Sequence, residues 1–252
     1  MTSRKIVRIV IDVGNTSITS AAAIDGEIIA PERVATSSIK DPQDFIELIK
    51  DIAARTKMTA VDIVACIGVQ TVREFAREAS HTTGLFLHLV SGDNPRGALL
   101  DYDSVSTLGP DRIANSIAAQ NVVPLPGVIV DCGTAITIDY IDAQGTFEGG
   151  AIMPGIETSR DALTHQAPVL PAVDLVAPKD IVGRDTVECI QSGVLYGAAA
   201  IIDTFVRRIT HERGSVTVIL TGGNAALLQP LIESEVSYDE FFTLRGLALA
   251  EL

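Results

Sequence analysis

The chain has 252 residues, of which 47% are hydrophobic, and it carries a formal net charge of −13. This length and composition allow one large domain or two smaller ones and exclude extensive disorder. The acidic charge and the lack of a basic stripe in the sequence argue against a nucleic-acid-binding protein. If the substrates are anions, a metal ion or a few local arginines must offset the field of the protein.

The sequence is typical of a soluble cytoplasmic protein with no membrane segment. The three cysteines lie far apart and form no C-x-x-C motif: Cys66, Cys132 and Cys189. Residues 1–14 do not read as a signal peptide, because Arg8 and Asp12 interrupt an apolar stretch that is already short. The longest uncharged apolar segment, residues 194–202, is too short to span a membrane.

The first half begins with an apolar strand that ends at Asp12, turns through Gly14 and Asn15, and resumes as a hydroxyl-rich strand. Residues 25–36 predict a third strand after this hairpin. The apolar spacing then predicts three helices and, between them, two short strands: helices over 41–56, 72–81 and 111–121, strands over 62–69 and 85–90. Three strands followed by alternating helices and strands indicate an α/β fold.

The second half repeats this pattern. The segment "IVDCGTAITIDYIDAQG" from Ile129 matches "VIDVGNTSITSAAAIDG" from Val10, so Asp131 is equivalent to Asp12 and Gly133 to Gly14. The segment "GTFEGGAIMPG" predicts a third strand here as well. Further elements are predicted as helices over 155–165, 186–213 and 224–232 and a strand over 216–223. The Pro- and Gly-containing stretch 121–127 predicts the junction between two domains, 1–122 and 123–252.

The duplicated turn has two readings. If the two halves face each other, Asp12 and Asp131 lie on opposite sides of one cleft. There, glycine turns can bind phosphate through backbone N–H groups and the acids can hold a cation. Each turn taken alone fits an ordinary hairpin with a solvated acid better, since such turns are common. The occurrence of the same turn in both halves favours the reading as a phosphate and cation site.

Residues 109–112 predict a helix start that carries candidate catalytic and binding residues. Gly109 and Pro110 precede Asp111 and Arg112, and a proline in the first turn is typical of such a start. The helix dipole stabilises an ionised Asp111, which can accept a proton from a substrate hydroxyl. Arg112 can bind an anionic substrate group. The alternative is a helix cap beside a surface arginine.

Two further motifs each allow a functional and a structural interpretation, and several common catalytic motifs are absent from the sequence. Thr221-Gly222-Gly223 follows a predicted strand and can approach a nucleotide or form an ordinary turn. The predicted helix 186–213 carries a small-residue face that includes Gly193 and Gly197, which suits close packing within the chain or between subunits. The sequence contains no zinc-ligand spacing, Walker A motif, G-x-S-x-G, or strand followed by G-x-G-x-x-G.

Taken in order, the motifs resemble the type III pantothenate kinase family over nearly the whole chain. They are "DVGNTS" (12–17), "YDSVSTLGPDR" (102–112), "DCGTAITID" (131–139), "GGAIMPGI" (149–156), "DTVECIQSGVLYG" (185–197) and "TGG" (221–223). The resemblance implies the superfamily of acetate and sugar kinases, Hsp70 and actin, with two ribonuclease-H-like domains and an active-site cleft between them. It also implies a homodimer that transfers phosphate from ATP to pantothenate, the first step of coenzyme A synthesis.

The resemblance also implies roles for individual residues. The first phosphate-binding loop corresponds to Asp12, Val13, Gly14, Asn15, Thr16, Ser17, Ile18 and Thr19. Asp12 is expected near Mg²⁺, Thr134 at the ATP phosphates, and Asp131 at a monovalent cation, K⁺ or NH₄⁺. Asp111 corresponds to the general base on the pantothenate hydroxyl. The substrate-binding residues correspond to Tyr102, Gly109, Pro110, Asp111, Arg112 and Thr186, with Thr186 reaching across the dimer.

Two residues depart from the family pattern, and two other functions remain open. Pro110 stands where a small residue is frequent, and Cys132 where phenylalanine is frequent. Neither change removes a group that the chemistry needs. A phosphohydrolase of the same superfamily would use its acid to activate water. A non-catalytic regulatory paralogue would keep the fold, but the loss of acids expected for it is not seen at Asp12, Asp111 or Asp131.

Overall fold

The computed structural model describes residues 7–57 and 62–252; residues 1–6, part of the stretch that argued against a signal peptide, lie outside it. Contacts divide the chain into two compact units, which are described separately. The first unit comprises residues up to Val123, Gly145–Phe147 and Phe241–Leu252, and the second comprises Pro124–Gln144 and Glu148–Glu240. The predicted domains, 1–122 and 123–252, stay a prediction. The contacts place residues 241–252 with the first unit, whereas the prediction had them in the second.

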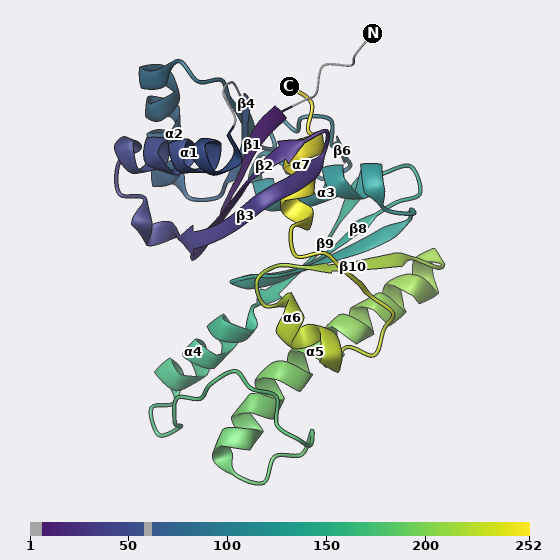
Figure 1. Cartoon of the computed structure of the whole chain (residues 1–252). Coiled ribbons are helices and arrows are strands. Elements are labelled where there is room, and N and C mark those ends of the chain that lie inside the picture. The colour runs from purple at the N-terminus through teal and green to yellow at the C-terminus, as the bar shows by residue number, and fades with distance from the viewer. Residues whose placement is uncertain (1–6, 58–61) are drawn as a thin grey trace. The chain divides into compact units, whose positions relative to one another are not determined.

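A five-stranded sheet forms the centre of the first unit, in the order β3-β2-β1-β4-β5 (Figure 1). Its strands are β1 (Val7–Val13), β2 (Ser17–Ile24), β3 (Glu27–Ala35), β4 (Asp62–Ile67) and β5 (Leu87–Val90). The first three are antiparallel neighbours, while β4 runs parallel to β1 and β5 parallel to β4. This is the predicted hairpin with its third strand, followed by helix–strand crossovers.

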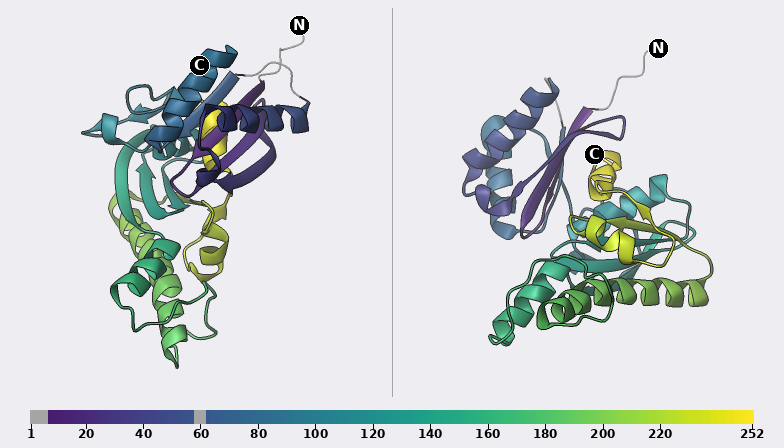
Figure 2. Two further views of the ribbon diagram at one scale, coloured as in Figure 1. Left: turned by 90° about the vertical axis from the view of Figure 1, so that its left-hand side faces the viewer. Right: turned by 60° about the horizontal axis from the view of Figure 1, so that its bottom comes forward.

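Helices cover both faces of this sheet, because β1 alternates buried side chains toward each of them. Ile9 and Ile11 pack with α1 (Pro42–Thr56) and α2 (Gln70–Thr83) on one face. Val10 packs on the other face with α3 (Pro110–Val122) and α7 (Phe242–Leu249). Figure 2 shows α1 and α2 on one side of the purple strands and the yellow α7 on the other.

The C-terminal helix is integral to this unit. Gly246 lies so close to α3 that a Cβ there would be 1.8 Å from the carbonyl oxygen of Ala114. The buried Arg8 of β1 donates from Nη1 to the carbonyl oxygens of Ala248 (2.6 Å) and Ala250 (2.8 Å). Burial lowers the pKa of the Arg8 guanidinium, although Asp62 opposes this shift. The sequence analysis did not predict α7.

The second unit contains the repeated hairpin in a sheet ordered β11-β10-β7-β8-β9, and β6 pairs with the start of β9. The strands of this sheet are β7 (Gly127–Cys132), β8 (Ala135–Ile141), β9 (Thr146–Pro154), β10 (Thr217–Thr221) and β11 (Ser237–Tyr238), whereas β6 (Leu99–Leu100) belongs to the first unit. Strand β8 is antiparallel to β7, and β10 is parallel to β7. The residues of β9 that pair with β6, Thr146 and Phe147, belong to the first unit by their contacts.

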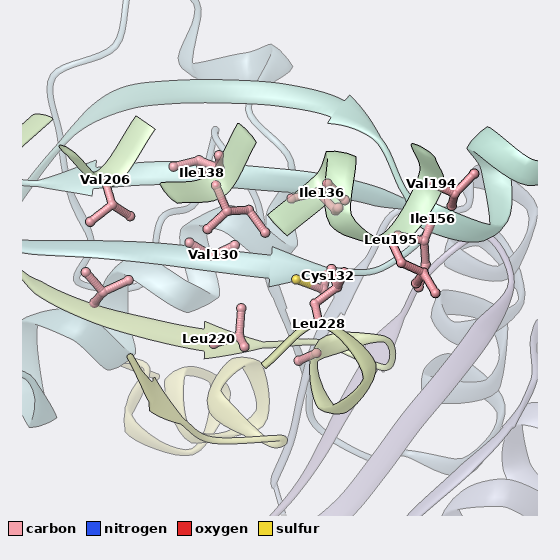
Figure 3. Close-up of a cluster of buried hydrophobic side chains, with 14 of the residues drawn as sticks. Val130, Cys132, Ile136, Ile138, Ile156, Val194, Leu195, Val206, Leu220 and Leu228 are labelled. Carbon is pink, nitrogen blue, oxygen red and sulfur yellow. The ribbon is translucent and has the colours of Figure 1, made fainter. Parts of the chain in front are cut away.

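Helix α5 (Thr186–Arg213) provides one side of the second core. Figure 3 shows its Val206 near the strand residues Val130 and Ile138, and its Val194 and Leu195 beside Ile156 of α4. Among the described helices, α5 alone is long and apolar enough to cross a membrane. Length and composition alone are weak evidence for a membrane span, because core helices of soluble proteins can share both. The shorter segment 194–202 considered in the sequence lies within α5.

Most predicted helices match the structure within two residues at each end. The remaining elements are α4 (Ile156–Gln166), α6 (Ala225–Leu228) and the 3₁₀ turns η1 (Thr36–Ser38), η2 (Val105–Thr107) and η3 (Gln229–Leu231). The predicted helix 224–232 is divided between α6 and η3, where Pro230 cannot continue an α-helical hydrogen-bond ladder. Side-chain caps mark two accurate starts, since Asp41 accepts from Asp44 N (3.0 Å) and Asp185 from Glu188 N (2.9 Å).

Candidate active site

The turn between β1 and β2 carries the first predicted phosphate loop. Gly14 N donates to the carbonyl oxygen of Ser17 at 3.0 Å, which closes the turn. From η1, the Thr36 hydroxyl donates to the carbonyl oxygen of Gly14 (2.7 Å) and Thr36 N donates to that of Thr16 (3.0 Å). The turn is therefore held in place by hydrogen bonds from a third segment, as a preorganised binding loop requires.

Asp12, the last residue but one of β1, has an unusual carboxyl environment. The Cys66 thiol of the neighbouring β4 donates to Asp12 Oδ1 at 3.0 Å. Burial raises the pKa of Asp12 from 3.8 to about 7; the Cys66 hydrogen bond and Arg33 act against this shift, and the charge of Asp111 adds to it. The carboxyl group therefore binds a proton more readily than an ordinary aspartate unless a cation is present.

The start of α3 positions Asp111. Asp111 Oδ1 accepts from Arg112 N at 2.9 Å, and the carboxylate lies over Gly109, where a Cβ would be only 2.4 Å from the same oxygen. Glycine is therefore required at 109 for this side-chain position. Within the described part of the chain, Asp111 Oδ2 makes no hydrogen bond. That oxygen is available to accept a proton or a hydrogen bond from a ligand.

These two segments line one cavity of about 390 Å³ in the first unit. Its walls are Asp12, Val13, Gly14, Asn15, Gly68, Arg73, Ser106, Thr107, Leu108, Gly109, Pro110 and Asp111. The cavity thus combines the predicted phosphate loop with the predicted acceptor loop. Sequence reasoning missed Arg73 and Gly68, although Gly68 follows a predicted strand and precedes a predicted helix, where binding residues are frequent.

Arg112 and Tyr102 lie in an aromatic cluster of the first unit and are absent from the lining of this cavity. Arg112 is only 5% exposed, and its guanidinium carbon is 5.2 Å from the Phe147 ring centre and 6.0 Å from that of Tyr102. The two rings meet edge to face at 5.7 Å. The described contacts therefore give Arg112 a cation–π role, and its expected contact with substrate stays a prediction.

In the second unit, Asp131 is the last residue but one of β7, as Asp12 is of β1. It is paired in register with Thr221 of β10 and Thr137 of β8. Gly222, with φ of +94°, approaches so closely that a Cβ would be 2.4 Å from Asp131 Oδ1. Burial, with the charge of Asp131, raises the pKa of the adjacent Cys132 thiol, which stays protonated. The small turn residues thus leave room for the carboxylate at the end of the sheet.

The second predicted phosphate residue, Thr134, is held by the start of α4. Its carbonyl oxygen accepts from Gly155 N (2.9 Å) and from the Thr158 hydroxyl (2.6 Å). A Cβ at Gly155 would be 2.2 Å from the carbonyl oxygen of Gly133. This close approach explains the Gly-Pro turn "MPGI" that the sequence singled out.

Thr186 starts α5 and lies in another cavity, of about 780 Å³, within the second unit. Arg184, Cys189, Gly193 and Gly197 also line this cavity. A Cβ added at Gly193 or Gly197 would meet no atom within 4 Å. The small-residue face of α5 therefore opens into space instead of packing against another helix of its own unit.

The structure thus brings together Asp12–Asn15 and Gly109–Asp111, within the first unit. The other predicted loop residues, Thr16, Ser17, Ile18 and Thr19, are absent from the cavity lining. The expectation of one cleft shared by the two halves stays a prediction. Over residues 7–57 and 62–252, no three His, Cys, Asp or Glu side chains gather as a metal site. A cation here would need oxygen ligands from phosphate, water or backbone besides one carboxylate, as Mg²⁺ in kinases commonly does.

The family model for type III pantothenate kinase matches residues 8–208 of this chain. A type III pantothenate kinase of Frankia alni is 35% identical over 242 residues, which cover 95% of this chain and 96% of that protein. The chain belongs to the type III pantothenate kinase family. Another family member, from Pelobacter propionicus, is 33% identical over 246 residues and is covered over 97% of its length. The family membership makes the protein a kinase.

Solved structures support the fold of this pantothenate kinase family member. The activator of 2-hydroxyisocaproyl-CoA dehydratase from Clostridium difficile, with bound ADPNP, matches with a TM-score of 0.60 at 12% identity, covering 97% of this chain and 93% of that one. A ROK hexokinase from Thermus thermophilus matches with a TM-score of 0.53 at 14% identity, covering 98% of both. The predicted pair of ribonuclease-H-like domains of the actin-like ATPase fold is therefore confirmed.

Proposed function

We propose that this protein phosphorylates pantothenate with ATP to give 4′-phosphopantothenate, the first step of coenzyme A synthesis. The observation that carries the proposal is a single cavity, in a member of this kinase family, that is lined by both Asp12–Asn15 and Asp111. Phosphoryl transfer needs groups that hold the phosphate and a group that receives the acceptor proton within reach of the same reacting atoms. Both kinds of group lie on the walls of this cavity.

Asp111 is the proposed general base. Its Oδ1 is held by the Arg112 backbone N–H, so Oδ2 is available for the primary hydroxyl of pantothenate. Asp111 lies in the first turn of α3 and lines the cavity with the phosphate loop. A carboxylate can act as this base because the hydroxyl proton leaves late in a loose phosphoryl-transfer transition state.

The ATP phosphates are proposed to bind Asp12 to Thr19 through backbone N–H groups, with Thr134 as a second contact. Mg²⁺ fits beside Asp12, since one carboxylate with phosphate and water oxygens is a usual ligand set; when bound, it neutralises charge on the transferring phosphate. Asp131 is proposed to hold the monovalent cation, K⁺ or NH₄⁺. The position of Asp131 in β7, equivalent to that of Asp12 in β1, supports this assignment, and a glycine is required at 222 because any side chain there would collide with the carboxylate.

The substrate is proposed to contact Tyr102 and Arg112 as well as the loop Gly109–Asp111. The loop Gly109–Asp111 supports this arrangement because it lines the cavity, and the rings of Tyr102 and Phe147 fix the side chain of Arg112, the next residue in the chain. We further propose a cytoplasmic homodimer formed through α5, with Thr186 contacting pantothenate across it. The open space beside Gly193 and Gly197 supports an unfilled packing face on this helix.

The test is an assay with ATP, Mg²⁺ and pantothenate, in which the product is identified by mass. The expected product is pantothenate plus one phosphoryl group, with one ADP formed for each product molecule. ATP hydrolysis at the same rate without pantothenate would instead indicate a phosphohydrolase. Nucleotide binding with no turnover of either kind would favour the non-catalytic paralogue.

A further inference from the structure

Arg73 is a cationic side chain in the candidate active-site cavity to which the sequence assigned no role. It belongs to the first turn of α2, which begins three residues after β4 ends. Strand β4 pairs with β1, the strand that carries Asp12. This topology brings the first turn of α2 to the same edge of the sheet as the phosphate loop, and Arg73 lines the cavity with Asn15 and Asp111.

The Arg73 guanidinium is anchored but not neutralised. Its Nη2 donates to the carbonyl oxygen of Ile67 at 2.5 Å, which fixes the side chain against the end of β4. A guanidinium has five N–H donors, so one such bond leaves most of them for a ligand. In the described part of the chain, no carboxylate forms an ion pair with Arg73. Its half-buried position strengthens an interaction with an anion relative to open solvent.

The negative charge of the cavity lining means that an anionic ligand needs a cationic side chain there. The lining includes two carboxylates, those of Asp12 and Asp111, and Arg73 is its only cationic side chain among the described residues. Two other arginines lie nearby without lining the cavity: Arg112 contacts the rings of Tyr102 and Phe147, and Arg33 donates to the Thr19 hydroxyl at 3.2 Å. In an acidic protein, an anionic acceptor entering this space would meet repulsion unless Arg73 faced it.

We propose that Arg73 binds the carboxylate of pantothenate and makes the enzyme select the acid over uncharged analogues. This inference rests on the proposed function. Pantothenate carries its primary hydroxyl and its carboxylate at opposite ends, and a cavity of about 390 Å³ is large enough for a ligand of this size. With the hydroxyl at Asp111, the carboxylate needs a second anchor. The proposed partners of the ATP phosphates are Mg²⁺ and backbone N–H groups, which leaves Arg73, the cationic side chain of the cavity lining, for the carboxylate.

The test compares two acceptors in the full-length enzyme: pantothenate, and pantothenol, in which a hydroxymethyl group replaces the carboxylate. A hydrogen-bonded ion pair in a partly enclosed site gives about 10- to 100-fold in affinity. We therefore expect the wild type to show a KM for pantothenate at least 10-fold below that for pantothenol. Arg73→Met should raise the KM for pantothenate about 10- to 100-fold and leave the KM values for pantothenol and ATP unchanged.

Two further variants complete the design. Arg77→Met is the matched control, since Arg77 lies one turn later on α2, is exposed, and is absent from the cavity lining; all its constants should equal those of the wild type. Arg73→Lys keeps the charge and should recover part of the pantothenate KM. An Arg73→Met variant that raises the KM of both acceptors alike, or that of ATP, would overturn the proposal.

The wild type alone also provides a test that needs no stable variant. If it phosphorylates pantothenol as efficiently as pantothenate, the carboxylate is not recognised and the inference about Arg73 is wrong, while the proposed kinase function stands. If it phosphorylates neither acceptor, the proposed function itself fails. The two failures are therefore distinguishable by the same pair of assays.

Discussion

Replacing Asp12 by asparagine should make the ligand-free protein more stable at pH 8 while it removes kinase activity. Burial raises the pKa of the Asp12 carboxyl from 3.8 to about 7, so the folded protein favours the protonated form. The stability that this proton provides is fully present below pH 4 and is lost as the pH rises through 7. Asparagine has a similar shape, can still accept from Cys66, and does not ionise.

The size of the effect follows from the same shift. A pKa difference of about 3 corresponds to about 4 kcal/mol, since each pKa unit is worth about 1.4 kcal/mol. Asp12 as a whole is half-buried, so solvent screening reduces this upper limit, and we expect a gain of about 2 kcal/mol at pH 8. For a chain of this length, that gain raises Tm by about 4–8 °C.

The assay is thermal or urea unfolding of wild type and Asp12→Asn between pH 5 and pH 8, with EDTA and without nucleotide. The difference in stability should grow with pH and level off above pH 7. Asp93→Asn, at an exposed position in the same unit, is the control and should show no such growth. A pH-independent difference, or a variant less stable at pH 8, would refute the reasoning about Asp12.

Three other predictions concern the proposed roles. Asp111→Asn should keep the fold and lower kcat by about 10²- to 10⁴-fold in a steady-state assay, and near-normal turnover would exclude it as the base. Asp131→Asn should abolish the stimulation by K⁺ or NH₄⁺; equal wild-type activity in Na⁺ and K⁺ would contradict that site. Ile201→Glu, on the exposed face of α5, should convert a dimer to a monomer in analytical ultracentrifugation. A wild type that is already monomeric would rule out the proposed interface.

The sequence was most informative where local chemistry decides the structure. The duplicated strand–Asp–Gly turn predicted two similar halves because apolar strands and glycine turns constrain the backbone over a few residues. The start of α5 was predicted at residue 186, where the Asp185 side chain caps the helix. The loop Gly109–Asp111 and the turn at Asp12 were both identified as candidate site segments, and they line one cavity.

The sequence was less informative where contacts between segments far apart in the chain decide the structure. Nothing near Arg73 distinguishes it from the exposed Arg77 one turn later, because only the pairing of β4 with β1 brings it to the cavity. Nothing near Arg112 shows that Phe147 covers its guanidinium, since the two residues are far apart in the chain. Helix α7 was missed because it is short and contains Gly246. A glycine is unfavourable within a helix, and only the close contact with α3 explains it here.

The return of the chain to its first unit has a consequence for biosynthesis. Leu244, Leu247 and Ala248 belong to the core around β1, so that core stays incomplete until the last segment leaves the ribosome. The second unit, in contrast, is complete once Glu240 has been made. We expect the second unit, and not the first, to be protease-resistant in released chains that stop at residue 240. Protection of both units at that stage would contradict this order, in which the half bearing Asp12 and Asp111 matures last.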